Sequence, residues 1–167
     1  MSEPTTLQVQ SFIARLSQLA PGDRARLKRN AGRTLAESHN AIGLFHRLLP
    51  PGVPEYEYET YFMAATLYPL ADDGGAGDLG RALRRAQRAH NKKGLDRRVE
   101  ILLDADKTQL PFRLRQAIHL LRSNRVKVDW PRLLTDLLRW NLPSRSVQQR
   151  WAKSYFTESQ NQSKKGA

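Results

Sequence analysis

The chain has 167 residues, with 28 lysines and arginines against 16 aspartates and glutamates, and a formal net charge of +12 at pH 7. A hydrophobic content of 40% excludes a fully disordered chain and suits one domain of ordinary size. The absence of cysteine excludes disulfides, thiolate zinc sites, iron–sulfur clusters and cysteine nucleophiles. Because the sequence has neither a secretion signal nor a long uncharged apolar run, we expect a cytoplasmic protein with no membrane anchor.

Apolar residues recur at helical spacing along most of the chain. The first segment has them at i, i+3, i+4, i+7 and i+10, namely at Val9, Phe12, Ile13, Leu16 and Leu19. Three further apolar faces are Ile42, Phe45 and Leu49; Tyr58, Tyr61, Phe62 and Ala65; and Leu114, Ala117, Ile118 and Leu121. Since strand alternation is absent, the pattern predicts an all-α bundle of about eight helices in one domain over residues 1–156. The polar residues 157–167 are predicted to form a disordered tail.

Local signals mark where some of these helices begin. Glu55, Glu57 and Glu59 fit either one face of a strand or the acidic first turn of a helix, and the helical spacing after them favours the helix. Asp129 and Ser144 have side chains that suit the N-cap position of two later helices.

The charges are segregated along the chain. Between Arg47 and Arg81 there is no lysine or arginine, whereas six acidic residues fall in that interval. Arginine supplies 20 of the 28 basic residues, and its planar guanidinium suits phosphate better than an ammonium group does. This distribution favours binding to a polyanion, with an ordinary solvated surface as the alternative.

One predicted helix carries a stripe of basic residues. On a helical wheel of residues 78–92, about 100° of the circumference holds Arg81, Arg84, Arg85, Arg88 and Lys92. The apolar side of the same wheel holds Leu79, Ala82, Leu83, Ala86 and Ala89. Asp78 would lie at the positive end of this helix. No acid between Arg81 and Lys93 relieves the repulsion, so a phosphate backbone is favoured over a solvated face.

Weaker basic sets lie on either side of this stripe. The first contains Arg24, Arg26, Lys28, Arg29 and Arg33, with Arg26, Arg29 and Arg33 expected on one helix face. The second contains Arg115, His119 and Arg122 beside an apolar helix face, with Arg125 and Lys127 in the turn that follows. The first set fits phosphate binding and a solvated surface equally well. The arginines of the second set could extend a basic track or cover the edge of the core with their stems.

Some arginines and aromatic residues are better explained by folding than by binding. Arg132 and Arg139 flank Asp136 at helical spacing, and Arg97 has Glu100 three residues further on, so we expect ion pairs on helix surfaces. The large aromatic residues of the C-terminal third share helical spacing with leucines, which favours core packing over base stacking. They are Trp130, Trp140, Trp151 and Tyr155.

The sequence offers little support for an enzyme. It lacks an H-E-x-x-H pair, a G-x-S-x-G elbow and a phosphate-binding loop of the G-x-x-x-x-G-K-[ST] type. Asp104 and Asp106 could be proposed as metal ligands of a nuclease, but acids at helix ends are common and no partner motif supports them. We therefore expect a non-enzyme that needs no cofactor and no metal.

Seven blocks of the sequence, in order and at suitable spacing, resemble the CasB small-subunit family of the type I-E CRISPR Cascade surveillance complex. The resemblance extends over about residues 10–156. The blocks are GDRARLKR at 22–29, FHRLLP at 45–50, YFMAATL at 61–67, LDRRVEILL at 95–103, LPFRLR at 110–115, VDW at 128–130 with Asp136, Leu137 and Trp140, and WAKSYF at 151–156.

The resemblance implies a non-catalytic, all-helical subunit present in two copies within the complex, where it contacts the backbone-forming and large subunits. It would hold the displaced non-target DNA strand without sequence specificity and stabilise the R-loop that forms when guide RNA pairs with the target strand. Basic residues that would face nucleic acid within the matching blocks are Arg24, Arg26, Lys28, Arg29, Arg97, Arg98, Arg113 and Arg115. The charge pattern adds Arg33, Arg81, Arg84, Arg85, Arg88, Arg122 and Lys127.

The expected partners are single-stranded and double-stranded DNA, the other Cascade subunits and a second copy of the chain, with guide RNA as a further candidate. A membrane is disfavoured because no apolar anchors lie opposite the arginine stripe. The alternative of a different class is a free-standing basic DNA-binding protein of the nucleoid or a regulator, which should carry base-reading Asn or Gln among its arginines.

Overall fold

The computed structural model describes residues 2–90 and 94–157, and within them the predicted all-α class is confirmed. These residues form nine α-helices, and their β structure is limited to one isolated bridge between Asp73 and Val128. The α-helices are α1 (Ser2–Ser17), α2 (Pro21–Lys28), α3 (Ile42–Leu48), α4 (Tyr58–Leu67), α5 (Leu79–His90), α6 (Leu95–Leu103), α7 (Leu110–Ser123), α8 (Trp130–Leu138) and α9 (Ser146–Ala152). Two 3₁₀ helices and a π-helical segment are η1 (Glu55–Glu57), η2 (Tyr68–Leu70) and η3 (Lys153–Thr157).

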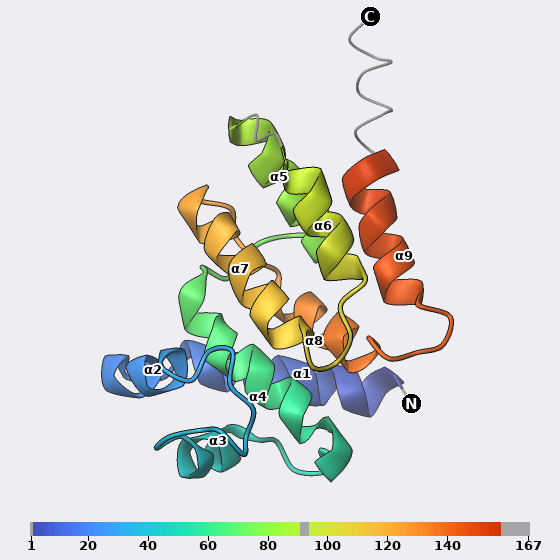
Figure 1. Cartoon of the computed structure of the whole chain (residues 1–167). Coiled ribbons are helices and arrows are strands. Elements are labelled where there is room, and N and C mark those ends of the chain that lie inside the picture. The colour runs from blue at the N-terminus through green and yellow to red at the C-terminus, as the bar shows by residue number, and fades with distance from the viewer. Residues whose placement is uncertain (1, 91–93, 158–167) are drawn as a thin grey trace, which may run out of the picture.

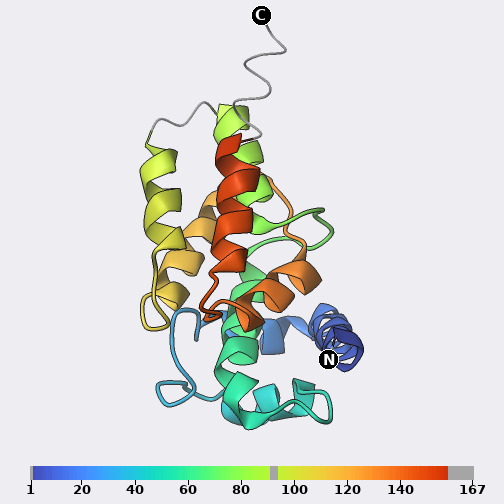
Figure 2. The ribbon, with the colours of Figure 1, turned by 90° about the vertical axis from the view of Figure 1, so that its right-hand side faces the viewer.

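The helices form two groups that α7 and α8 connect (Figure 1). In the N-terminal group, α1 packs against α3 and α8, while α4 packs against α2, α7 and α8. In the other group, α5 packs against α6, α9 and η3, and Figure 2 shows α5, α6 and α9 running side by side. Because α7 contacts helices of both groups, side chains on its exposed face can lie next to residues from distant parts of the sequence.

The apolar pattern predicts the buried face of α1 correctly and that of α3 only in part. Of the five expected residues of the first face, four are fully buried and Leu19, beyond the end of α1, is half-buried. In α3, Ile42 is 52% exposed, whereas Leu44, Phe45 and Leu48 are buried. Helix α3 has only seven residues. Its contact with α1, and not the i, i+3 spacing alone, decides which side of this helix is buried.

The acidic segment before α4 is helical, as the sequence predicts. Glu55 and Glu57 lie in η1, which leads directly into α4. Glu59, in the first turn of α4, accepts hydrogen bonds from the backbone nitrogen of Leu35 at 3.2 and 3.1 Å. Glu59 therefore holds the loop after α2, whereas Glu55 is exposed and Glu57 half-buried in η1.

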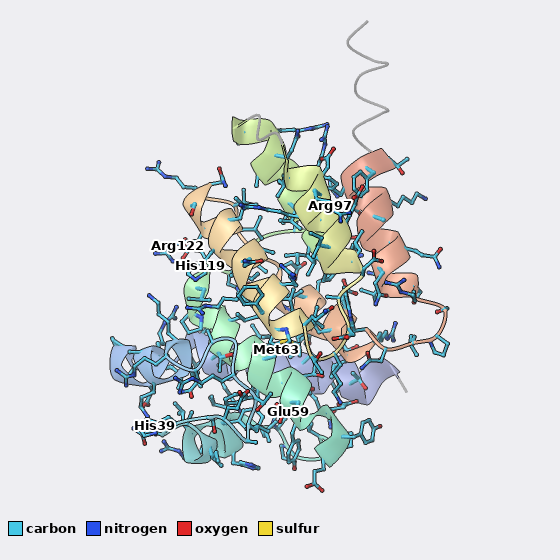
Figure 3. The ribbon with its side chains drawn as sticks, viewed as in Figure 1. His39, Glu59, Met63, Arg97, His119 and Arg122 are labelled. Atoms are coloured by element: carbon cyan, nitrogen blue, oxygen red, sulfur yellow. The ribbon has the colours of Figure 1, made fainter. Side chains whose placement is uncertain are left out.

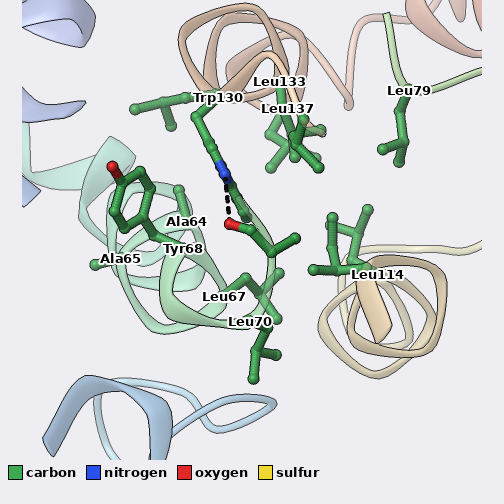
Figure 4. Close-up of a cluster of buried hydrophobic side chains, with 14 of the residues drawn as sticks. Ala64, Ala65, Leu67, Tyr68, Leu70, Leu79, Leu114, Trp130, Leu133 and Leu137 are labelled. Carbon is green, nitrogen blue, oxygen red and sulfur yellow. Dashed lines mark hydrogen bonds between the residues drawn. The ribbon is translucent and has the colours of Figure 1, made fainter. Parts of the chain in front are cut away.

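The aromatic residues that the sequence assigns to the core are buried. Trp130, Trp140, Trp151 and Tyr155 are at most 3% exposed, which confirms core packing. The indole nitrogen of Trp130 donates to the carbonyl oxygen of Ala71 at 3.3 Å, within the apolar cluster of Figure 4. Burying an indole without such an acceptor would be costly, so this bond fixes how α8 sits against the end of η2.

Three carboxylates hold the C-terminal segment α9–η3 against the rest of the domain. Asp78 accepts a 2.8 Å hydrogen bond from Ser154 Oγ, and Asp96 accepts a 2.6 Å hydrogen bond from the hydroxyl of Tyr155. Asp136 binds both Arg150 and Trp151. The acids lie before α5, in α6 and in α8, so one short segment ties three parts of the chain together.

The two predicted N-caps have different outcomes. The side chain of Asp129 accepts a hydrogen bond from the backbone nitrogen of Arg132 at 3.2 Å, which confirms it as the cap of α8. The prediction for Ser144 is wrong, because α9 starts at Ser146 with Arg145 at the N-cap. Arg145 adopts a left-handed conformation and donates to the carbonyl oxygen of Leu103 at 2.6 Å, so a distant contact decides where this helix begins.

Two predictions concern residues that lie wholly or mostly outside the described ranges. The predicted tail falls outside the described residues except for Thr157, which ends η3, and Lys92 of the basic stripe also falls outside them. Among the helices that the structure describes, none combines the length and the apolar composition needed to span a membrane.

Candidate nucleic-acid interface

Two arginines of the first basic set are engaged in contacts within the fold. Arg26 forms a 3.0 Å ion pair with Asp23 and donates through Nε to the carbonyl oxygen of Asn40 at 3.1 Å. The guanidinium of Arg24 lies 5.5 Å from the centre of the Tyr68 ring, a cation–π contact that joins α2 to η2. Both side chains are half-buried and make contacts within the fold, so Arg24 and Arg26 are weaker candidates for binding than the exposed residues of this set.

The expectation that Arg33 shares a helix face with Arg26 and Arg29 is wrong, because α2 ends at Lys28. The chain turns at Asn30, a buried residue whose Nδ2 donates to the carbonyl oxygens of Arg26 and His39 at 2.8 and 3.0 Å. Arg33 nevertheless stays close to Arg29, since both line a surface hollow after α2.

His39 and Asn40 complete this hollow. His39 could not be predicted from helical spacing, because its approach to Arg29 depends on the return of the chain around Asn30. The hollow therefore presents two exposed guanidiniums and an imidazole at one end of α2.

The exposed face of α7 carries the second basic set. Arg115, His119 and Arg122 follow one another at i, i+4 and i+7, and all three are exposed. Figure 3 shows His119 and Arg122 on the same side of this helix. The predicted spacing is thus confirmed as one solvent-facing row, beside the buried Leu114, Ile118 and Leu121.

Tertiary packing brings the turn after α2 next to this row. A Cβ atom at Gly32 would lie 3.7 Å from Cδ of Arg115, so the turn after α2 reaches the side of α7. Partial burial lowers the pKa of His119, and the positive charges of Arg115 and Lys28 lower it further. Residues that are separated by about 90 positions in the sequence thus form one cationic surface.

One neighbouring acid, Asp72, offsets part of the positive charge at the end of α7. Arg122 is 3.6 Å from Asp72, with both side chains more than half exposed. The backbone nitrogen of Val128 donates to the carbonyl oxygen of Asp72 at 2.8 Å, which holds the loop at 72–75 against the turn after α7. Lys127 lies along this loop, with its Cδ 3.8 Å from the position of a Cβ at Gly74.

The arginine stripe of α5 is largely as predicted. Arg81, Arg85 and Arg88 are exposed, and the apolar side of the helix is buried except at Ala89. Asp78 lies at the N-terminus of α5 as expected, where it accepts from the backbone nitrogen of Arg81 at 2.9 Å. Three guanidiniums therefore project from this helix into solvent.

Arg84 departs from the stripe. It is half-buried, and its Nη1 donates to the side-chain oxygen of Gln87 at 2.8 Å. Burial and a hydrogen bond to Asp96 raise the pKa of Tyr155, while the charge of Arg84 acts on the same hydroxyl in the opposite direction. Arg84 thus belongs to the contact between α5 and η3 rather than to the exposed stripe.

The basic residues of α6 and the start of α7 have mixed surroundings. Arg97 is 3.4 Å from Glu100, which confirms the expected ion pair. Arg98 and Arg113 line a largely apolar hollow between α5, α6 and α7 together with Leu83 and Val99. Arg113 also lies 5.4 Å from the centre of the Phe112 ring. These contacts leave Arg98 as the exposed cation at the hollow, beside the half-buried Arg113.

The expected ion pairs of Asp136 with Arg132 and Arg139 are wrong. Asp136 is buried, and its carboxylate binds Arg150 at 2.9 Å and the indole of Trp151 at 2.8 Å. The inward position of Asp136 turns it toward α9, whereas a surface ion pair would need it on the outer side of α8.

The two acids considered as metal ligands have other roles. Asp106 accepts hydrogen bonds from the backbone nitrogens of Thr108 and Gln109, both at 2.9 Å, before α7 begins. Asp104 is 3.4 Å from Arg145. Within the described part of the chain, no group of three or more His, Asp or Glu side chains is arranged to hold a metal ion.

The exposed cations that form no ion pair within residues 2–90 and 94–157 are the strongest candidates for phosphate binding. From the predicted set, they are Lys28, Arg29, Arg33, Arg81, Arg85, Arg88, Arg98, Arg115 and Lys127. They lie on α2 and its following turn, on α5, on α6 and on α7 with its following turn. Such a distribution is suited to a flexible polyanion that follows the surface over several contacts.

Comparison with known proteins agrees with the resemblance found in the sequence. Residues 23–156 match the family described as CRISPR-associated protein Cse2. A protein of that description from Thermus thermophilus is 43% identical over 102 residues, which is 60% of this chain and 57% of the relative, so the match spans little more than half of the relative's length.

Solved structures give the same result for the fold. The crystal structure of CasB from M. ruber has a TM-score of 0.78 and 28% identity, with coverage of 96% of this chain and 98% of that one. A chain of a structure described as a CRISPR RNA-guided surveillance complex has a TM-score of 0.80 at 21% identity, over 98% and 99% of the two chains. Because the family match covers most of the described domain and the fold agrees over nearly its whole length, the chain belongs to the Cse2 family of CRISPR-associated proteins.

Proposed function

We propose that this protein is the non-catalytic small subunit of a type I-E CRISPR RNA-guided surveillance complex, Cascade, and acts in the cytoplasm. Membership of the Cse2 family supports the proposal, as does the similar fold of a chain within a CRISPR RNA-guided surveillance complex. In this role the protein binds the displaced non-target DNA strand without sequence specificity and so stabilises the R-loop. R-loop formation is nearly balanced in free energy, so a modest gain from contacts to one strand shifts it.

The observation that carries the proposal is the set of exposed cations on α5 and α7 that form no ion pair with the described residues. Arg85 and Arg88 on α5 and Arg115 on α7 have exposed side chains and form no ion pair with the described residues. Contacts to phosphate fix position but carry no sequence information. A surface of this composition favours binding that depends on charge and hardly on base sequence.

Helix α5 gives less support to a regulator that reads base sequence. Gln87 is the one amide side chain of α5 that could reach a base edge, and its oxygen accepts a 2.8 Å hydrogen bond from Arg84. A recognition helix in the major groove needs free polar groups of this kind. The occupied amide favours the assembly subunit over a free-standing regulator.

The surface of η1, which contains Glu55 and Glu57, is the surface that we assign to protein partners. Glu55 and Tyr56 are exposed in η1, with 83% of Tyr56 accessible. Carboxylates repel a DNA strand but suit a basic protein surface. The backbone-forming and large subunits, a second copy of this chain and guide RNA complete the set of partners that we propose.

The test is reconstitution of the complex with guide RNA and the other subunits, followed by measurement of R-loop lifetime. The double variant Arg85→Ala/Arg88→Ala should shorten the lifetime while the variant still joins the complex. The matched control, Arg132→Ala/Arg139→Ala, removes the same charge from a surface hollow that also contains Asp129 and Asp136, and it should leave the lifetime unchanged. Failure of the chain to assemble with the other subunits, or equal lifetimes in all three complexes, would contradict the proposal.

A further inference from the structure

Arg115 and His119 of α7 lie beside the turn that follows α2, although α2 and α7 are far apart in the sequence. His119 is one helical turn from Arg115 on α7, and both are exposed. Lys28, the last residue of α2, acts on His119 through its charge. The turn at Gly32, four residues after the end of α2, closely approaches Arg115 on the side of α7.

Acids on the neighbouring elements have partners of their own. Arg115 from α7 and Lys28 from α2 are the charged groups that lower the pKa of His119. On the elements packed against α7, Glu59 of α4 binds Leu35, and Tyr68 of η2 lies under Arg24. Asp72, in the neighbouring loop, is paired with Arg122.

Partial burial and the two fixed charges favour the neutral form of the His119 imidazole in the free protein. They lower its pKa below the ordinary value, with partial burial as the largest cause. A phosphate group placed between Lys28 and Arg115 brings a negative charge to the same position and reverses the electrostatic part of this effect. The imidazolium then becomes a third donor to the phosphate, since both of its ring nitrogens carry protons.

We infer that Lys28, Arg115 and His119 form one phosphate-binding site, in which His119 takes up a proton when a phosphodiester binds between the lysine and the arginine. This inference rests on the proposed function and extends it, because it names one phosphate site within the cationic surface and gives that site a dependence on pH. The proton comes from solvent, and no covalent bond is made or broken.

The direction of the pH dependence follows from the linkage between protonation of His119 and phosphate binding. Protonation is favoured in the complex, so the affinity for nucleic acid is highest at low pH and falls as pH rises above the pKa of the free imidazole. Where the free protein is neutral at His119 and the complex is protonated, log K falls by up to about 1 for each pH unit. Between pH 6 and pH 8 we expect the affinity of the unaltered chain to fall by about three- to tenfold because of this residue.

The experiment measures binding of the full chain to a fluorescent single-stranded oligothymidine at constant salt from pH 5.5 to 8.5. His119→Gln should remove most of the pH dependence and bind at the weaker, high-pH level throughout. His119→Lys keeps a positive charge at every pH, and it should bind tightly at pH 8 as well as at pH 6. The matched control is His46→Gln, because His46 is exposed on α3 and its ring contacts Phe45 and Tyr58.

A second measurement reads the proton itself. In NMR titrations, the imidazole signal of His119 should move to a higher pKa when the oligonucleotide is bound, and the variant His46→Gln should show the same change at His119. An unaltered pH dependence in His119→Gln, or equal pKa values with and without the oligonucleotide, would overturn the inference while leaving the proposed function in place. Absence of any binding by the unaltered chain would instead count against the proposed function.

Discussion

The carboxylate of Asp136 in α8 accepts a 2.8 Å hydrogen bond from the indole nitrogen of Trp151 in α9. The same carboxylate binds Arg150 at 2.9 Å, and the Asp136 side chain is only 4% exposed. A buried acceptor that serves two donors is expensive to lose, because both donors are then left without a partner. This relationship makes α9 part of the same cooperative unit as α8.

Replacing Asp136 should therefore weaken the whole fold. For Asp136→Ala we expect a loss of about 2–3 kcal/mol in the free energy of unfolding, a value reduced because Arg150 remains partly solvated. Urea denaturation followed by circular dichroism measures it. The control is Arg139→Ala, a change at an exposed residue just after α8, which should stay within about 0.5 kcal/mol of the unaltered protein. Equal stability of the two variants would show that the hydrogen bonds are not made.

Gly80 is predicted to be essential for the close packing of α5 on α9. A Cβ atom at this position would collide with the carbonyl oxygen of Trp151, so Gly80→Ala must push the two helices apart. We expect a loss of about 1–3 kcal/mol from this overpacking. Gly43→Ala in α3 is the control, because a Cβ there meets no atom within 4 Å. It should stabilise the protein by up to about 1 kcal/mol, as alanine does in a helix. Stabilisation by both variants would contradict the packing.

Tyr61 should lower the stability of the protein at alkaline pH. Burial and the charge of Glu57 raise the pKa of Tyr61 to about 12. The unfolded chain loses this proton near pH 10, so the stability due to Tyr61 is complete below pH 10 and is lost as pH rises from there to about 12. We expect the loss to be about 1.4 kcal/mol per pH unit.

The variant Tyr61→Phe should lower the slope by this amount in unfolding experiments between pH 10 and pH 12, while Tyr155, whose pKa is raised as well, keeps its own contribution. The hydroxyl oxygen of Tyr61 is buried and has no hydrogen-bond partner among the described residues. At pH 7 the variant should consequently be as stable as the unaltered protein, or more stable by up to about 1 kcal/mol. Tyr56→Phe, at a side chain 83% exposed, should keep the slope. An unchanged slope in Tyr61→Phe would assign the loss to other groups.

Neighbouring arginines of α5 should separate binding from stability. Arg85→Ala removes an exposed charge, so the slope of log K against log salt for single-stranded DNA should fall by about 0.7. Its free energy of unfolding should change by less than about 0.5 kcal/mol. Arg84→Ala should keep the salt slope and lose about 1 kcal/mol of stability, because the half-buried Arg84 donates to Gln87 and packs at η3. The reverse result would place Arg84 in the binding surface.

Helical periodicity was sufficient to predict the fold class and most buried faces. The buried rows of α1, α5 and α7 follow from apolar spacing, because burial of one side of an amphipathic helix is a local property of its sequence. The cap at Asp129 and the ion pair of Arg97 with Glu100 are local in the same sense. Contacts between residues up to about four positions apart can therefore be predicted from the sequence.

The remaining features depend on approach between distant segments. The inward turn of Asp136 toward α9, the start of α9 at Ser146 and the loss of Arg84 from the exposed stripe each result from partners more than ten residues away. The same holds for the candidate site. Its charge and its helix faces were determined by the sequence alone. The approach of Lys28 to Arg115 and His119 was decided only by the tertiary structure, which brings the turn after α2 to the side of α7. Periodicity orders residues around one helix and carries no information on which segment lies next to it.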